Sequence, residues 1–116
     1  MGIEYVAVYN NWVGWEKGEA PVGIVVAERI YAPDLESLVY HAMHWDHLQQ
    51  GWVYDPEGNA QYLAEISEER IRGIERGEAE RVTPGITGGE GLPDEDTIRW
   101  IFQWKGAPPQ AEDTGY

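Results

Sequence analysis

At 116 residues the chain is long enough for one domain of ordinary size and too short for two. Its formal net charge of -13 would suit a disordered acidic segment, but 42% of the residues are hydrophobic and 12% aromatic, which is typical of a chain that folds. The excess of carboxylates disfavours direct contact with nucleic-acid phosphates or anionic lipids, and the lack of cysteine excludes disulfides, thiolate metal ligands and a cysteine nucleophile.

Two segments near the N-terminus have the composition of β-strands. Residues 3–10 place apolar side chains on both faces of an extended chain, and residues 23–32 begin in the same way, so both are predicted to be interior or half-covered strands. The connection between them, residues 10–21, is rich in glycine and contains Trp12 and Trp15. It is predicted to form a long hairpin loop.

A helix is predicted next, from Leu35 to Gln50. An aspartate precedes this segment and a glycine follows it, which are the usual signals for the start and the end of a helix. At 100° per residue its apolar side chains gather on one side, which would pack on the sheet. Tyr40, His44 and His47 fall on the other side, where they would form part of a recognition surface.

The second half of the chain is predicted to contain two further strands and one helix. Residues 52–54 favour a short strand, and residues 60–81 favour a helix with a break near Ser67, which is a candidate cap for a new segment. Residues 83–93 are rich in glycine and proline and are predicted to be a flexible connector. Residues 97–105 alternate strictly between apolar and polar, which predicts a last strand with one buried face: Ile98, Trp100, Phe102 and Trp104.

Together these elements predict an α+β fold with a mainly antiparallel sheet, in the order β-β-α-(β)-α-β, and two helices packed on one face. Residues 1–105 would form this single domain, and residues 106–116, with few apolar groups, would be a disordered tail. The N-terminal residues lack the pattern of a secretion signal, and no apolar run is long enough to span a membrane. We therefore expect a cytoplasmic protein without membrane contact.

The three histidines lie within seven residues, at positions 41, 44 and 47, and raise the question of a metal site. On a helix they would fan over about 120°, so one ion would take only an adjacent pair and would need a carboxylate from another element, such as Glu65 or Glu75. We predict no metal, and keep binding by an adjacent pair as the less favoured alternative.

No other motif predicts chemistry. The glycine run at 85–91 lacks the lysine of a phosphate-binding loop, and neither Ser37 nor Ser67 lies in the pattern of a serine nucleophile. Neighbouring carboxylates are expected by chance in so acidic a chain. We therefore predict no catalytic residue and no cofactor.

High negative charge without a catalytic set favours a non-enzymatic interaction protein. We expect an inhibitor or accessory factor of the phage or mobile-element type, which occludes a basic and possibly nucleic-acid-binding surface of a partner protein as a nucleic-acid mimic would. The tryptophans of the loop either fold back over the core or stand exposed. If they are exposed, this loop and the polar side of the predicted helix supply the candidate contact residues: Trp12, Trp15, Glu16, Glu19, Tyr40, His44 and His47.

Three alternatives remain open at this stage. One is a small enzyme or ligand-binding domain whose aromatic pocket holds a histidine, such as His41, or a glutamate as general acid or base. Another is a structural or assembly subunit, for which homo-oligomers would form. In the third, the acidity serves solubility alone.

Overall fold

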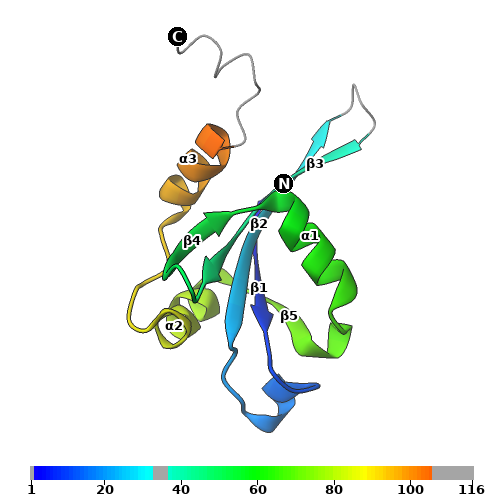
Figure 1. Cartoon of the computed structure of the whole chain (residues 1–116), viewed down its shortest axis with the longest axis vertical. Helices are drawn as coiled ribbons and strands as arrows, with labels where there is room; N and C mark the ends of the chain where they lie inside the picture. Colours follow the sequence, from blue (N-terminus) through cyan, green and yellow to red (C-terminus); the bar gives the residue numbers. More distant parts are fainter. Residues whose placement is uncertain (1, 33–36, 106–116) are drawn as a thin grey trace.

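The computed structural model describes residues 2–32 and 37–105, which form a five-stranded antiparallel sheet with three α-helices (Figure 1). The sheet order is β4-β3-β2-β1-β5. The strands are β1 (Ile3–Val8), β2 (Gly23–Ala32), β3 (Ser37–Asp46), β4 (Gly51–Tyr54) and β5 (Ile71–Ile74). The helices are α1 (Pro56–Glu65), α2 (Arg76–Thr87) and α3 (Glu95–Lys105), and two short 3-10 helices are η1 (Gly14–Lys17) and η3 (Glu68–Arg70). The predicted α+β class with an antiparallel sheet is confirmed.

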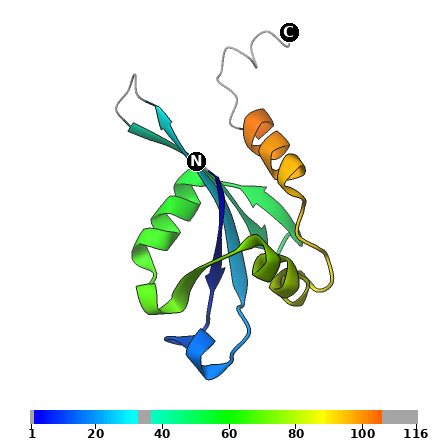
Figure 2. The same ribbon diagram turned by 180° about the vertical axis from the view of Figure 1, so that it is seen from behind.

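Helices cover the sheet on both faces, as Figures 1 and 2 show from opposite sides. On one face α2 and α3 close the larger core, and on the other α1 lies over a smaller apolar group. The larger core is formed by alternate strand residues and by the inner sides of α2 and α3: Tyr5, Ile24, Val26, Met43, Trp45, Ala79, Ile86, Ile98 and Phe102. The prediction placed two helices, 35–50 and 60–81, on one face; in the structure α2 and α3 share one face and α1 lies on the other.

The predicted helix from Leu35 to Gln50 is wrong, because residues 37–46 form strand β3 and residues 47–50 form the turn that follows it. Eight residue pairs join β3 to β2, and four more join it to β4, so that its backbone is hydrogen-bonded on both sides. Alternation then buries Met43 against α2 and α3 and Ala42 towards α1. The strand forms because β2 needs a partner on its second edge, a tertiary demand that local helix signals do not contain. Part of the predicted helix start, residues 33–36, lies outside the described residues.

The predicted last strand is also wrong, because residues 95–105 form α3. Asp94 caps this helix, its Oδ1 accepting a hydrogen bond from the Thr97 backbone N–H at 2.8 Å. Ile98 and Phe102, four residues apart, share the buried side of the helix. Trp100 and Trp104 are each 60% exposed and stack on each other on the outer side, with ring centroids 5.5 Å apart, so the prediction that they belong to the core is wrong.

The predicted strands at residues 3–10, 23–32 and 52–54 are confirmed, with small differences in their ends. The predicted helix over 60–81 is α1 and α2 with η3 and β5 between them. The break at Ser67 is confirmed, because its Oγ accepts from the Glu69 N–H at the start of η3. The predicted connector is helical up to Thr87. The predicted tail, residues 106–116, lies outside the described residues.

None of the helices within the described ranges has the length and hydropathy needed to cross a membrane.

Candidate functional site: a pocket between the sheet and helix α1

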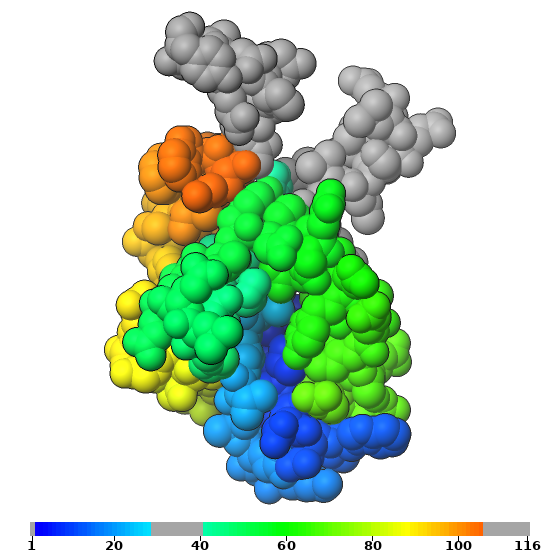
Figure 3. All heavy atoms as spheres, viewed as in Figure 1, coloured from blue at the N-terminus to red at the C-terminus, as the bar shows by residue number. Residues whose placement is uncertain are grey.

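A pocket of about 520 Å³ lies between the sheet and α1, a volume within the range of small-ligand sites. Figure 3 shows the hollow between α1 and the turn that joins β3 to β4, with β1 and β2 behind it. Its lining comes from β1, the start of β2, the end of β3 and the first turns of α1: Val8, Val22, Gly23, Ile24, Val25, His44, Trp45, His47, Asp55, Gly58, Asn59 and Tyr62.

The wall formed by α1 depends on how this helix begins. Asp55 is the N-cap, its Oδ1 accepting from the Gly58 backbone N–H at 3.0 Å, and Pro56 occupies the first helical turn, where a missing N–H costs nothing. A Cβ at Gly58 would lie 2.1 Å from the Asp55 Oδ2. Glycine at position 58 therefore lets the capping carboxylate lie against the helix at the pocket wall.

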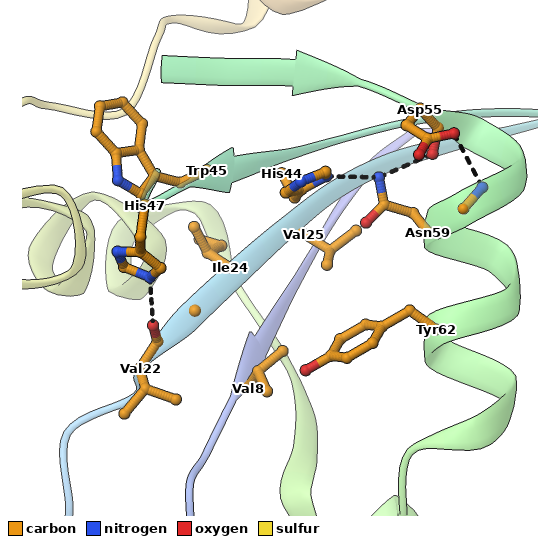
Figure 4. Close-up of a pocket in the computed structure, with 12 residues that line it drawn as sticks. Val8, Val22, Ile24, Val25, His44, Trp45, His47, Asp55, Asn59 and Tyr62 are labelled. Carbon is orange, nitrogen blue, oxygen red and sulfur yellow. Dashed lines mark hydrogen bonds between the residues drawn. The ribbon is translucent and has the colours of Figure 1, made fainter. Parts of the chain in front are cut away.

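Asn59 and His44 form the polar contact inside the pocket (Figure 4). The Asn59 Nδ2 donates to the Asp55 carbonyl oxygen at 2.9 Å and lies 3.1 Å from the His44 Nδ1. Because an amide nitrogen only donates, His44 accepts at Nδ1 and carries its proton at Nε2. Asn59 is 4% exposed, and among the described residues its Oδ1 has no hydrogen-bond partner.

At the mouth, His47 connects the end of β3 to the start of β2. Its Nε2 lies 3.2 Å from the Val22 carbonyl oxygen, to which it donates. Asp46, between two lining residues in the chain, accepts from the backbone N–H groups of Gln49 and Leu48. The hydrogen bond from Gln49, followed by that from Leu48, lowers the pKa of Asp46, so its negative charge persists to lower pH.

The part of the sequence that forms most of the pocket contains carboxylates and no cations. Between Arg29 and Arg70 there is neither lysine nor arginine. The same stretch contributes eight carboxylates: Asp34, Glu36, Asp46, Asp55, Glu57, Glu65, Glu68 and Glu69. The pocket lining itself contains one carboxylate, Asp55, and no described lysine or arginine, so the charge on its wall is negative.

The structure separates the three histidines that the sequence places close together. His44 and His47 line the pocket, as two of the predicted contact residues. His41 lies on the other face of β3, where its Nδ1 is 2.7 Å from the Tyr54 hydroxyl and its ring stacks on Phe102 at 5.4 Å. Within the described ranges no group of three or more metal-ligating side chains is positioned to hold an ion.

The remaining predicted contact residues lie away from the pocket lining. Trp12 is 62% exposed on the loop before β2, whereas Trp15 packs edge-on against Tyr9. Glu16 is exposed on η1, and Glu19 accepts from the Asn11 side chain through both carboxylate oxygens. Tyr40 pairs with Arg29 in the β2–β3 register.

Sequence reasoning missed Asp55, Gly58, Asn59 and Tyr62 as site residues. Residues 55–58, Asp-Pro-Glu-Gly, lie between the predicted strand at 52–54 and the predicted helix at 60–81 and were assigned to neither. An aspartate followed by proline is a helix start signal, and that signal would have placed Asn59 and Tyr62 three residues apart on one side of a helix.

No protein-family model, curated protein or solved structure matches this chain.

Proposed function

We propose that this chain is a non-enzymatic acidic protein that docks on a basic surface of a partner protein and occludes it. A partner surface that otherwise binds nucleic acid fits best, because it carries the lysines and arginines that complement a charge of -13. The role would be that of an inhibitor or accessory factor.

The observation that carries this proposal is the cation-free stretch between Arg29 and Arg70. In the fold it becomes β3, β4 and α1, which include an edge strand and the helix beside the pocket. The cations elsewhere are largely engaged: Arg76 donates to Glu80 at 2.8 Å, and Lys105 lies over the Trp104 ring. Strands β3 and β4 and helix α1 therefore offer carboxylates to a basic partner and carry no lysine or arginine of their own.

The enzymatic alternative lacks comparable support from the pocket. His41, its candidate acid or base, does not line the pocket, and His44 is held by an amide rather than by a carboxylate. We therefore place recognition of a partner before catalysis.

The proposal is tested with two triple variants that remove equal charge. Glu57, Glu65 and Glu68, in the cation-free stretch, are replaced by glutamine in the first. Glu75, Glu90 and Asp96, which lie outside it, are replaced by their amides in the second. Partners recovered with the wild type are identified, and their association rates are measured with both variants.

We expect a basic partner whose association slows more with the first variant than with the second, and whose affinity falls between about 50 and 200 mM salt. The partner should also lose its nucleic acid when this protein binds. Neutral or acidic partners, salt-independent affinity or equal effects of the two variants would contradict the proposal.

A further inference from the structure

The pocket contains one side-chain acceptor that has no donor among the described residues. Asn59 is 4% exposed, its nitrogen makes both of the hydrogen bonds of this side chain, and its Oδ1 has no partner in the described part of the chain. Figure 4 shows this oxygen turned away from Asp55 and towards Val25. The oxygen is not sealed off, because it is not among the fully buried unpartnered atoms of the described residues, so a ligand in the pocket can donate an N–H or O–H group to it.

The charge around that acceptor selects a cation. Asp55 lines the pocket and uses its Oδ1 for the Gly58 N–H, while its Oδ2 has no partner among the residues described. No described lysine or arginine is part of the lining. A neutral donor would satisfy the Asn59 oxygen alone, whereas a cationic donor would also satisfy the carboxylate.

The remaining walls suit an aliphatic stem and a flat cationic group. Val8, Val22 and Val25 present methyl groups, and Tyr62 adds an aromatic ring on the α1 side (Figure 4). Long basic side chains bury their methylene groups along such surfaces and place their charge at a polar edge or over an aromatic ring.

We propose that the pocket receives a long basic side chain of the partner protein, arginine in particular. The stem lies against the valines, and the guanidinium donates to the Asn59 Oδ1 and to the Asp55 carboxylate. Arginine is favoured over lysine because its five N–H donors are spread around a wide planar group, which can serve two separated acceptors, whereas the lysine ammonium is a single point of charge. This inference rests on the proposed function, which supplies the basic partner.

The direct test is an NMR titration of the isotope-labelled full chain with the peptide acetyl-Gly-Gly-Arg-Gly-Gly-amide. Two matched peptides carry citrulline, which keeps the shape and loses the charge, or norleucine, which keeps only the stem. The arginine peptide should shift the side-chain NH2 signals of Asn59 and the amide signal of Gly58. Citrulline should bind about tenfold more weakly, and norleucine more weakly still.

Two variants with closely matched controls separate the pocket from the general field of the protein. Asp55→Asn keeps an N-cap side chain and removes the charge at the pocket, and Asp94→Asn makes the same change at the cap of α3. Val22→Phe fills the mouth from a position that is 46% exposed, and Leu48→Phe adds the same ring at a position that is 96% exposed and is not part of the lining. Asp55→Asn should weaken binding about tenfold and Val22→Phe should abolish it, while both controls change it less than twofold.

Equal losses for Asp55→Asn and Asp94→Asn would overturn the inference, as would equal binding of the arginine and norleucine peptides. The proposed function would survive either result, because a surface field attracts a basic partner without any pocket. A third result would contradict both proposals. It is that free N-acetyl-arginine amide binds as tightly as the arginine peptide, and that no basic partner is recovered with the wild-type protein. The pocket would then bind a small molecule.

Discussion

Replacing Phe102 and Trp100 one at a time by alanine tests the helix at residues 95–105. In α3 the Phe102 side chain is 1% exposed and packs in the core, whereas Trp100 is 60% exposed and its main contact is the stacked Trp104. Removing a buried phenylalanine costs about 3–5 kcal/mol, and losing an exposed aromatic pair costs no more than about 1.5 kcal/mol. A strand would place both residues on one face and give them similar costs.

Urea unfolding monitored by far-ultraviolet circular dichroism measures both losses without depending on tryptophan emission. With a slope of about 2 kcal/mol per molar, Phe102→Ala should lower the midpoint by about 2 M, and Trp100→Ala by less than about 0.8 M. Phe102→Leu gives a smaller, measurable loss in case the alanine variant does not fold. Equal midpoint shifts for Trp100→Ala and Phe102→Ala would refute the reasoning.

Three further predictions concern the backbone and the pH dependence of stability. Gln50 has a φ of 54°, a left-handed conformation that glycine adopts without strain. Gln50→Gly should therefore raise the free energy of unfolding by up to about 1 kcal/mol, whereas Gln49→Gly should not. A lower melting temperature for Gln50→Gly would contradict this. Burial raises the pKa of Tyr5, Tyr9 and Tyr54, so the unfolded chain loses these protons first and stability should fall above about pH 10. Tyrosinate absorbance should show late titrations from these three tyrosines in the folded protein, and these should disappear in denaturant. The Thr97 N–H lowers the pKa of Asp94, so its contribution to stability is present above about pH 4 and is lost as the pH falls through the folded pKa; melting temperatures of the wild type and Asp94→Asn should differ at pH 7 and converge in acid, and a constant difference would count against the cap.

The sequence was sufficient for the fold class because its first strands have apolar residues on both faces, a pattern that few other structures allow. The two segments were predicted wrongly for the same reason: their apolar residues fit both the repeat of a helix and the repeat of a strand. Ile98 and Phe102 lie four residues apart, a spacing that puts two residues on the same face of either a strand or a helix. The helix forms because Asp94 caps it and because both side chains pack in the larger core. Residues 37–46 form a strand rather than a helix because they pair with the second edge of β2.

The candidate site was predicted only in part. His44 and His47 were selected as neighbours on a helix, yet they meet at the pocket because a strand and its turn bring them to the same end of the sheet. Asn59 was missed because nothing in its local sequence shows that its amide faces a histidine 15 residues earlier. Such contacts arise from the packing of α1 on the sheet.

The close approach of Asp55 to Gly58 has a consequence for substitutions at position 58. A side chain at position 58 would displace the carboxylate that caps α1, because even a Cβ would lie 2.1 Å from it. A residue with a side chain at position 58 would therefore oblige the Asp55 carboxylate to turn, and the negative charge in the pocket wall would move with it.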